Sequence, residues 1–224
     1  GGPQNGQLCV LKEFKSGSVY EDSFFQNDIK AVDKAGAIIT AFNVHFANRY
    51  APGKKTIMLN RPAVWQEVYP DSTGKHKKKL VEPMLEGEFL KFNSNSGYTN
   101  GAEFMQALSH YSYHQTHGQH LLCDLQGGHY EDCYVLTDPV VMSRNKKEFG
   151  ATDLGVEGMN NFFAHHKCNG FCDRTWLKPT SPKASLRLPP VASTSMSLSI
   201  GTVAVKSEAE RQKQLDAILS MSRR

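Results

Sequence analysis

Apolar and polar residues alternate from Leu8 to Phe14, which predicts a β-strand, and Asn5-Gly6 before it predicts a hairpin turn. The alternation places Lys12 on the same face as Val10 and Phe14. An ammonium at the edge of an apolar wall is a natural partner for a phosphate oxygen. An ordinary lysine on an exposed edge strand is the alternative that the pattern leaves open.

Apolar residues then recur at spacings of three, four and seven from about Phe24 to Tyr50. This period predicts a long amphipathic helix, which we expect to lie across a small antiparallel sheet and to end at Pro52-Gly53. A second helix is predicted over residues 102–114. Short apolar runs predict further strands at 57–59, 63–69, 80–82, 121–122 and 134–136.

The segment from Glu82 to Gly87 contains a proline and a glycine four residues apart, which suits a connector between two lobes. We therefore expect an N-lobe of about residues 1–82 and a C-lobe of about residues 87–179. The first three of the further strands would join the N-lobe sheet, and the last two would belong to the C-lobe.

Serine, threonine and proline dominate after Pro179, so residues 180–224 are predicted to be a flexible tail that ends in a short helix near 207–221. The serines of this tail are candidate phosphorylation sites on composition alone. They are Ser181, Ser185, Ser193, Ser195, Ser197 and Ser199.

The composition is that of a globular protein, with 39% apolar residues and a net charge of +4. The basic run at residues 75–79 is interpreted as a solvated loop, so we expect no nucleic-acid partner.

Five cysteines are too few and odd in number for a disulfide scaffold, and no stretch is long and apolar enough to span a bilayer. We expect an intracellular, cytoplasmic protein, and the start at Gly1 without a methionine is consistent with a fragment.

Two aspartates follow short apolar runs, at positions where strands open into turns. Asp124 comes after Leu121-Leu122, and Asp138 stands before Pro139, which cannot continue a ladder. Carboxylates at the ends of adjacent strands, with the amide oxygen of Gln126, are ligands of the kind that Mg²⁺ prefers. Each aspartate alone could instead be an ordinary turn former.

A cluster of histidine and cysteine follows at His166, Cys168 and Cys172, which offers three ligands to a structural zinc ion. Cys168 and Cys172 are four residues apart and would share one face of a helix. Pure helical geometry would favour His165 over His166 as the third ligand. The alternative to a metal site is a pair of buried free cysteines beside two surface histidines.

These residues and their order resemble the atypical alpha-kinase family over roughly residues 8 to 178. The resemblance implies an α+β, two-lobed protein-kinase-like fold, with a small antiparallel sheet and a helix in the N-lobe and a zinc-stapled C-lobe. It is carried by seven motifs in order: Val10-Leu11-Lys12, Lys91 to Tyr98, Leu108-Ser109-His110-Tyr111, Asp124-Leu125-Gln126-Gly127, Leu136-Thr137-Asp138-Pro139, Gly155-Val156-Glu157-Gly158 and His166 to Cys172.

The resemblance implies an ATP-dependent serine/threonine protein kinase that transfers the γ-phosphate of Mg-ATP to protein hydroxyls. The serines of its own tail are candidate acceptors for autophosphorylation on composition alone. Lys12 would contact the phosphates, and Asp124 would orient or deprotonate the acceptor hydroxyl. Gln126 and Asp138 would hold Mg²⁺. Asp138 is also expected to be one of the catalytic residues. This division of roles fits phosphoryl transfer, which needs positioning and charge neutralisation more than covalent chemistry.

Two further sites are implied in the same way. The connector would be a hinge whose backbone, at Glu82 and Met84, pairs with adenine, and a glycine loop at residues 150–159 would lie near the substrate. The implied zinc ligands are His110, His166, Cys168 and Cys172.

Two departures from the family pattern bear on activity. Residues 129–133 lengthen the link between the two aspartate turns, which is tolerable at a hairpin tip. The family's glycine-rich strands should precede Lys12, where the sequence has eleven residues. A catalytically weak, kinase-like binding or scaffolding module is therefore the alternative function.

Overall fold

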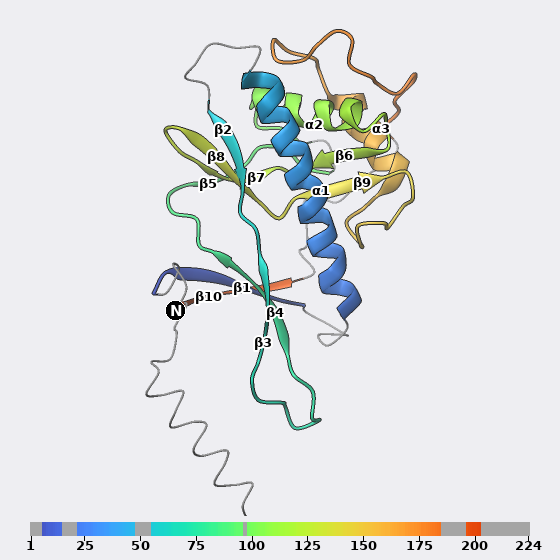
Figure 1. Cartoon of the computed structure of the whole chain (residues 1–224). Helices are drawn as coiled ribbons and strands as arrows, with labels where there is room; N and C mark the ends of the chain where they lie inside the picture. The colour runs from blue at the N-terminus through green and yellow to red at the C-terminus, as the bar shows by residue number, and fades with distance from the viewer. Residues whose placement is uncertain (1–5, 15–21, 48–54, 96–97, 185–195, 203–224) are drawn as a thin grey trace, which may run out of the picture.

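The computed structural model describes residues 6–14, 22–47, 55–95, 98–184 and 196–202, which form an α+β fold of sheets and helices (Figure 1). The helices are α1 (Asp22–Ala47), α2 (Glu103–Gln115) and α3 (Gly155–His165). The strands are β1 (Leu8–Phe14), β2 (Thr56–Leu59), β3 (Ala63–Gln66), β4 (Lys78–Pro83), β5 (Phe89–Lys91), β6 (His120–Cys123), β7 (Gln126–His129), β8 (Cys133–Thr137), β9 (Val140–Ser143) and β10 (Met196–Thr202).

The small sheet is antiparallel, with the strand order β10-β1-β4-β3, and it forms the lower part of the molecule in Figure 1. The strand predicted at Leu8–Phe14 is confirmed as β1. The prediction of a flexible tail is wrong for residues 196–202, because β10 pairs with the full length of β1. The helix predicted near 207–221 lies outside the described residues.

The remaining strands form two further sheets, with the order β2-β8-β7-β5 in one and β6-β9 in the other, so β2 belongs with the C-lobe although it precedes residue 87. The prediction that residues 57–59 join the small sheet is wrong, since β2 pairs with β8 and runs parallel to it. The Asn43 side chain supports this arrangement by bonding to both the backbone N–H and the carbonyl of Ile57. The predicted hairpin tip at residues 129–133 is confirmed as the turn between β7 and β8.

Helix α1 confirms the long amphipathic helix, but its position differs from the prediction. It packs chiefly against β2, α2 and β9 of the C-lobe rather than across the small sheet. Only its N-terminal part reaches that sheet, where Phe25 and Ile29 line a shallow groove with Val64 of β3. None of the helices in the described part of the chain has the length and apolar character that a membrane span requires.

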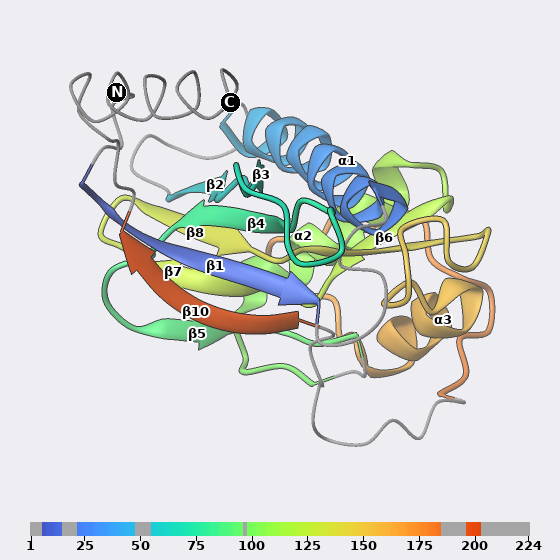
Figure 2. The same ribbon diagram turned by 90° about the horizontal axis from the view of Figure 1, so that it is seen from below.

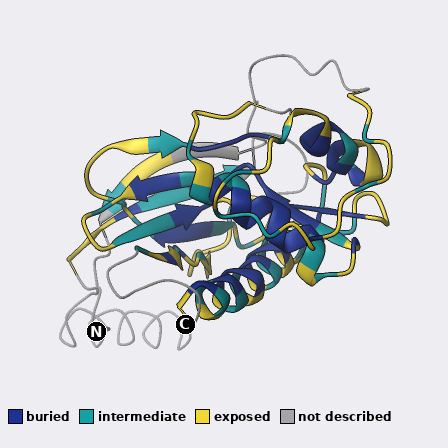
Figure 3. Ribbon diagram, turned by 90° about the horizontal axis from the view of Figure 1, so that it is seen from above, coloured by how far each residue is buried: buried dark blue, intermediate teal, exposed yellow. Residues whose placement is uncertain are grey.

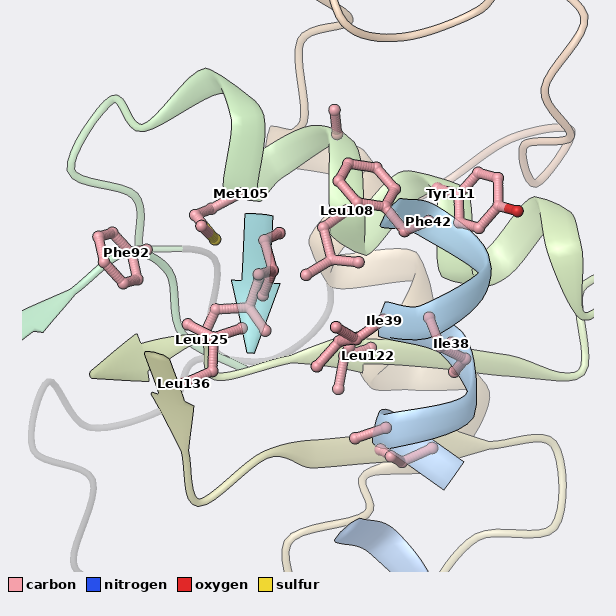
Figure 4. Close-up of a cluster of buried hydrophobic side chains, with 14 of the residues drawn as sticks. Ile38, Ile39, Phe42, Phe92, Met105, Leu108, Tyr111, Leu122, Leu125 and Leu136 are labelled. Atoms are coloured by element: carbon pink, nitrogen blue, oxygen red, sulfur yellow. The ribbon is translucent and has the colours of Figure 1, made fainter. Parts of the chain in front are cut away.

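The main apolar core lies where α1 and α2 meet the C-lobe strands (Figure 4). Buried residues gather on the helix and strand faces that point at one another, and exposed ones lie on the outside (Figure 3). Fully buried members of this core are Ile38, Phe42, Met105, Leu108, Leu122 and Leu136.

The segment predicted as a glycine loop, residues 150–159, is only partly a loop. Gly155 to Gly158 form the first turn of α3, and the loop is confined to the residues before them. Gly158 allows α3 to lie close to β9, because a Cβ there would fall 2.2 Å from Sδ of Met142. The buried carboxylate of Asp153 holds the preceding loop by accepting hydrogen bonds from the N–H groups of Ser143 and Gly155, each at 2.9 Å.

Candidate active site and metal cluster

The two aspartate turns face each other in a single interrupted hairpin. Strands β6 and β9 pair at Cys123↔Val140, and β7 and β8 pair in the same register at Gln126↔Thr137. The ladder breaks between these pairs, at Asp124 and Asp138 on opposite strands. Both aspartates have positive φ angles, 58° and 49°, which is uncommon for residues other than glycine and is often found at functional sites. The prediction of two strand-end carboxylates is therefore confirmed in geometry.

Lys12 connects the small sheet to this hairpin. Its ammonium lies 2.6 Å from Oε1 of Glu82 on β4 and also contacts Oδ1 of Asp138. Thr137 donates a hydrogen bond of 2.7 Å to the other oxygen of Glu82. Lys12 is only 3% exposed, which excludes the alternative of an ordinary exposed lysine. Burial raises the pKa of Glu82, and the nearby Lys12 charge opposes that rise.

Asp28 of α1 is a further carboxylate of this site that the sequence did not reveal. Its pKa is raised to about 6, mainly by burial and next by the negative charge of Asp138, while Lys12 lowers it. Its Oδ2 is buried and has no hydrogen-bond partner. Because Asp28 lies in the N-terminal part of α1 with no motif around it, the local sequence carries no sign of this role.

Asp124 is held from the C-lobe side. Its Oδ1 forms an ion pair of 2.9 Å with Lys91 of β5. The loop that carries it is fixed by Asn93, whose Oδ1 accepts from the N–H of Leu125 at 2.9 Å and whose amide donates to Oγ of Ser109. Asn93 of the motif Lys91 to Tyr98 thus has a structural role in the described part of the chain.

Gly127 is required by the geometry of the same motif. Its φ is 148°, and a Cβ at this position would lie 2.0 Å from the carbonyl oxygen of Val135 on the neighbouring strand. No side chain fits there, so β7 and β8 approach closely immediately beyond Gln126. Gln126 begins β7 and is paired on the backbone with Thr137, the residue before Asp138, so Gln126 lies beside the Asp138 turn.

The connector between the lobes begins where β4 ends at Pro83. The N–H of Met84 donates a hydrogen bond of 3.0 Å to the carbonyl of Leu8 on β1. This amide is therefore engaged within the protein, and a base could meet the Met84 backbone only at its carbonyl unless that bond opens. The sequence could not reveal this pairing because it depends on where β1 begins relative to the end of β4.

The histidine and cysteine residues predicted as a zinc site converge. The distance from Nε2 of His166 to Nδ1 of His110 is 3.2 Å, and Sγ of Cys168 lies 3.6 Å from each of these atoms. Sγ of Cys172 lies 3.7 Å from Nε2 of His166. Tetrahedral zinc, with bonds of about 2.0 Å to nitrogen and 2.3 Å to sulfur, separates its ligands by about 3.3–3.8 Å. Two imidazoles and two thiols at these separations fit a tetrahedral ion.

The protonation of the cluster also suits a metal. The pKa of His110 and that of His166 are each lowered to about 4, mainly by burial, so both rings are neutral near pH 7. Nε2 of His110 lies 3.1 Å from the carbonyl of Leu177, which orients the ring with Nδ1 toward the cluster. Burial raises the pKa of Cys172 to about 11, and a bound cation would reverse that shift.

One expectation about this cluster is wrong. Cys168 and Cys172 do not share a helix face, because α3 ends at His165 and His166 adopts an extended conformation with ψ of 123°. The extended residue turns the chain so that His166, not His165, points at the other ligands. Nδ1 of His165 instead lies 2.8 Å from the carbonyl of Asn161.

The interrupted hairpin, the lysine that bridges two lobes and the four-residue cluster together define a kinase-like fold of the alpha-kinase type. A family model described as the alpha-kinase family matches residues 1–172, and the chain belongs to this family. Myosin heavy chain kinase A of Dictyostelium discoideum is 32% identical over 173 residues, which are 75% of this chain and 14% of that protein. Eukaryotic elongation factor 2 kinase of Homo sapiens is 32% identical over 135 residues, 59% of this chain and 18% of that protein.

Solved structures agree with these relatives. The apoenzyme alpha-kinase domain of myosin-II heavy chain kinase A superposes with a TM-score of 0.63 at 30% identity, over 72% of this chain and 60% of that one. An inactive form of that domain complexed with ATP gives a TM-score of 0.62 at 31% identity, over 72% and 61% of the two chains. The chain spans less than a fifth of the length of both curated relatives named above.

Proposed function

We propose that this chain is the catalytic domain, over residues 1–179, of an ATP-dependent serine/threonine protein kinase. The observation that carries the proposal is the contact of Lys12, from the small sheet, with Glu82 and with Asp138 of the C-lobe hairpin. A buried ammonium flanked by carboxylates at a junction of two lobes is suited to holding the phosphates of a nucleotide with its metal ion. The named relatives are protein kinases, which supports the same reading.

Each group of the site has a distinct part in this proposal. Lys12 binds a phosphate oxygen, and Glu82 holds its ammonium in place. Gln126 and the half-exposed carboxylate of Asp138 offer hard oxygen ligands to Mg²⁺, which would neutralise phosphate charge. Asp124 orients the acceptor hydroxyl and takes its proton, and its ion pair with Lys91 fixes the carboxylate.

The metal cluster has no part in the chemistry. We propose that His110, His166, Cys168 and Cys172 hold a structural zinc ion, since all four ligand atoms lie within 4.8 Å of one another. The ion would join α2 to the segment after α3 and so fix the C-lobe that carries the hairpin. An intracellular, cytoplasmic location belongs to the same proposal, because all five cysteines are free thiols.

The test is transfer of radiolabelled phosphate from Mg-ATP to a generic basic protein and to the chain itself. We expect transfer to serine and threonine, shown by phosphoamino acid analysis, and loss of at least about 100-fold in Asp138→Asn. The matched control is Asp132→Asn at the exposed hairpin tip, which should transfer normally.

Mass spectrometry of the product would show whether the serines of the tail are acceptors. Absence of transfer by well-folded, zinc-loaded protein would contradict the proposal and favour a kinase-like binding module. Transfer that is equal in Asp138→Asn and the parent would contradict the assigned site.

A further inference from the structure

The edge of the small sheet beside β1 is occupied by a strand from near the other end of the sequence. All seven residues of β1 pair with β10, from Leu8↔Thr202 to Phe14↔Met196. On its other side β1 pairs with β4, so it is an inner strand of the sheet. Figure 2 shows β10 running beside β1 along its whole length. The strand that carries Lys12 is therefore held from both sides.

The pairing register fixes which face each residue of β10 presents. Directly opposed residues of an antiparallel pair lie on the same face of the sheet. Ile200 is opposite Val10, and Val10 is opposite Glu82 on the next strand. Lys12 lies two residues along β1 and so shares this face, where it contacts Glu82. Ile200, which is 67% exposed, thus extends the face of the nucleotide lysine.

The opposite face shows why the register is specific. Gly201 is opposite Cys9, and a Cβ at Gly201 would lie 3.6 Å from Sγ of Cys9 and 2.8 Å from Cδ1 of Leu11. A residue without a side chain at this position lets β10 lie close to β1. Ser199, two residues earlier on the same face, is opposite Leu11 and exposed.

We propose that β10 forms part of the nucleotide site, and that Ile200 and Val10 make an apolar wall for the adenosine portion of ATP. This inference rests on the proposed function and adds a binding residue to it. Along a strand, Val10 and Lys12 are about 7 Å apart, which is the scale of the ribose between a base and its phosphates. An apolar side chain opposite Val10 is therefore placed to contact the nucleoside while Lys12 contacts phosphate.

Docking of β10 is tested by disulfide formation in the full chain. In Gly201→Cys the new thiol should form a disulfide with the native Cys9 under mild oxidation, since Leu11 can shift its side-chain end. The control is Ser199→Cys, because residues diagonal across a pair are about 7–8 Å apart and should not bond to Cys9. Peptide mass spectrometry distinguishes the two. Failure of Gly201→Cys to link, or equal linking of both variants, would overturn the inference.

Nucleotide binding is tested by steady-state kinetics. Ile200→Ala should raise KM for ATP roughly 3- to 10-fold with kcat within about twofold, because apolar contact is lost equally from ground and transition states. Ser199→Ala, on the opposite face, should change neither constant. Ile200→Ala combined with Gly201→Cys should still form the disulfide, which shows that β10 remains docked. An unchanged KM in a docked Ile200→Ala chain would overturn the assignment.

The disulfide-linked Gly201→Cys protein shows whether docked β10 is part of the active site or obstructs it. Oxidised Gly201→Cys should retain the phosphoryl transfer of the parent chain oxidised in the same way. Transfer that is lost on oxidation and restored by reduction would show that docked β10 obstructs the site, which contradicts the inference. If the unmodified chain transfers no phosphate at all, the proposed function fails, while the disulfide result still reports on docking.

Discussion

The small sheet and the C-lobe differ in what holds each together. Among the described residues, the larger apolar core cluster is built from α1 and the C-lobe, and the smaller one from the C-lobe alone. Neither of these clusters of described residues contains a residue of β1, β3, β4 or β10. The small sheet buries only a few apolar side chains, such as Cys9, Leu80 and Val81, beside the charged pair of Lys12 and Glu82. The C-lobe adds to its core the cluster of His110, His166, Cys168 and Cys172, whose side chains could hold a metal ion.

This difference matches the two tasks of the site. In the proposed function the carboxylates of the hairpin need fixed positions, and a packed core together with the proposed zinc site supplies them. The small sheet depends on backbone pairing and on ion pairs, which open more readily than an apolar core. Under the proposed function, we expect a nucleotide to enter beside Lys12 without disturbing Asp124.

The largest expected effect is at Gly127, where the C-lobe leaves no space. We predict that Gly127→Ala lowers the free energy of unfolding by at least about 3 kcal/mol, because the Cβ meets backbone and the φ angle is unfavourable. Denaturant unfolding measures this change. The matched control is Gly128→Ala, whose Cβ would meet the side-chain ring of Tyr130 as its nearest neighbour instead of backbone. Equal stability of the two variants would show that the close approach of β7 and β8 is not required.

Removal of the proposed zinc ion tests whether the C-lobe and the small sheet are stabilised separately. We predict that chelation, or Cys172→Ser, lowers Tm by about 10 °C and increases amide exchange in α2 and after α3, but not in β1. Cys133→Ser, which changes a cysteine outside the cluster, should leave Tm within about 2 °C of the parent. Zinc content is checked by mass spectrometry. An equal increase of amide exchange in β1 and in the C-lobe segments would contradict the idea that the metal stabilises the C-lobe alone.

The smallest effect concerns Asp28 and its pH dependence. Because the folded pKa is raised from 3.8 to about 6, the charged carboxylate is disfavoured in the fold. Stability from this group is complete below pH 3.8 and is lost as the pH rises to about 6. Asp28→Asn should therefore stabilise the nucleotide-free protein by about 1–2 kcal/mol at pH 8 and by almost nothing at pH 4.

Asp33→Asn on the same helix is the control for that series, because Asp33 is exposed and pairs with Arg61 at the surface. It should show no gain at pH 8. A gain from Asp28→Asn that is the same at both pH values would mean that the effect does not come from the buried charge.

Features that depend on neighbouring residues could be predicted from the sequence. The alternation at Leu8–Phe14, the helical period of α1 and the Pro139 turn each predicted an element that the structure contains. The two aspartate turns were found because turn chemistry is local. The cluster ligands followed from short spacing and from the family resemblance, since His110 lies 56 residues before His166.

Features that depend on distant pairing could not be predicted in this way. The short run in β2 does not show which sheet it joins, and its parallel partner β8 lies more than seventy residues away. Asp28 has no local pattern that sets it apart. The strand β10 did carry a sign that was missed, since Met196, Leu198 and Ile200 alternate with serines, but the serine-rich composition favoured a flexible tail.

Amide hydrogen exchange with and without Mg²⁺ and a non-hydrolysable ATP analogue tests most directly whether the two regions form one nucleotide site. We predict that binding increases protection both in β1 and β4 of the small sheet and at the turns of Asp124 and Asp138. The segment after α3 that carries the proposed zinc ligands His166, Cys168 and Cys172 should exchange at the same rate in both conditions. Protection confined to one of the two regions, or found only elsewhere, would contradict a site shared by Lys12 and the hairpin.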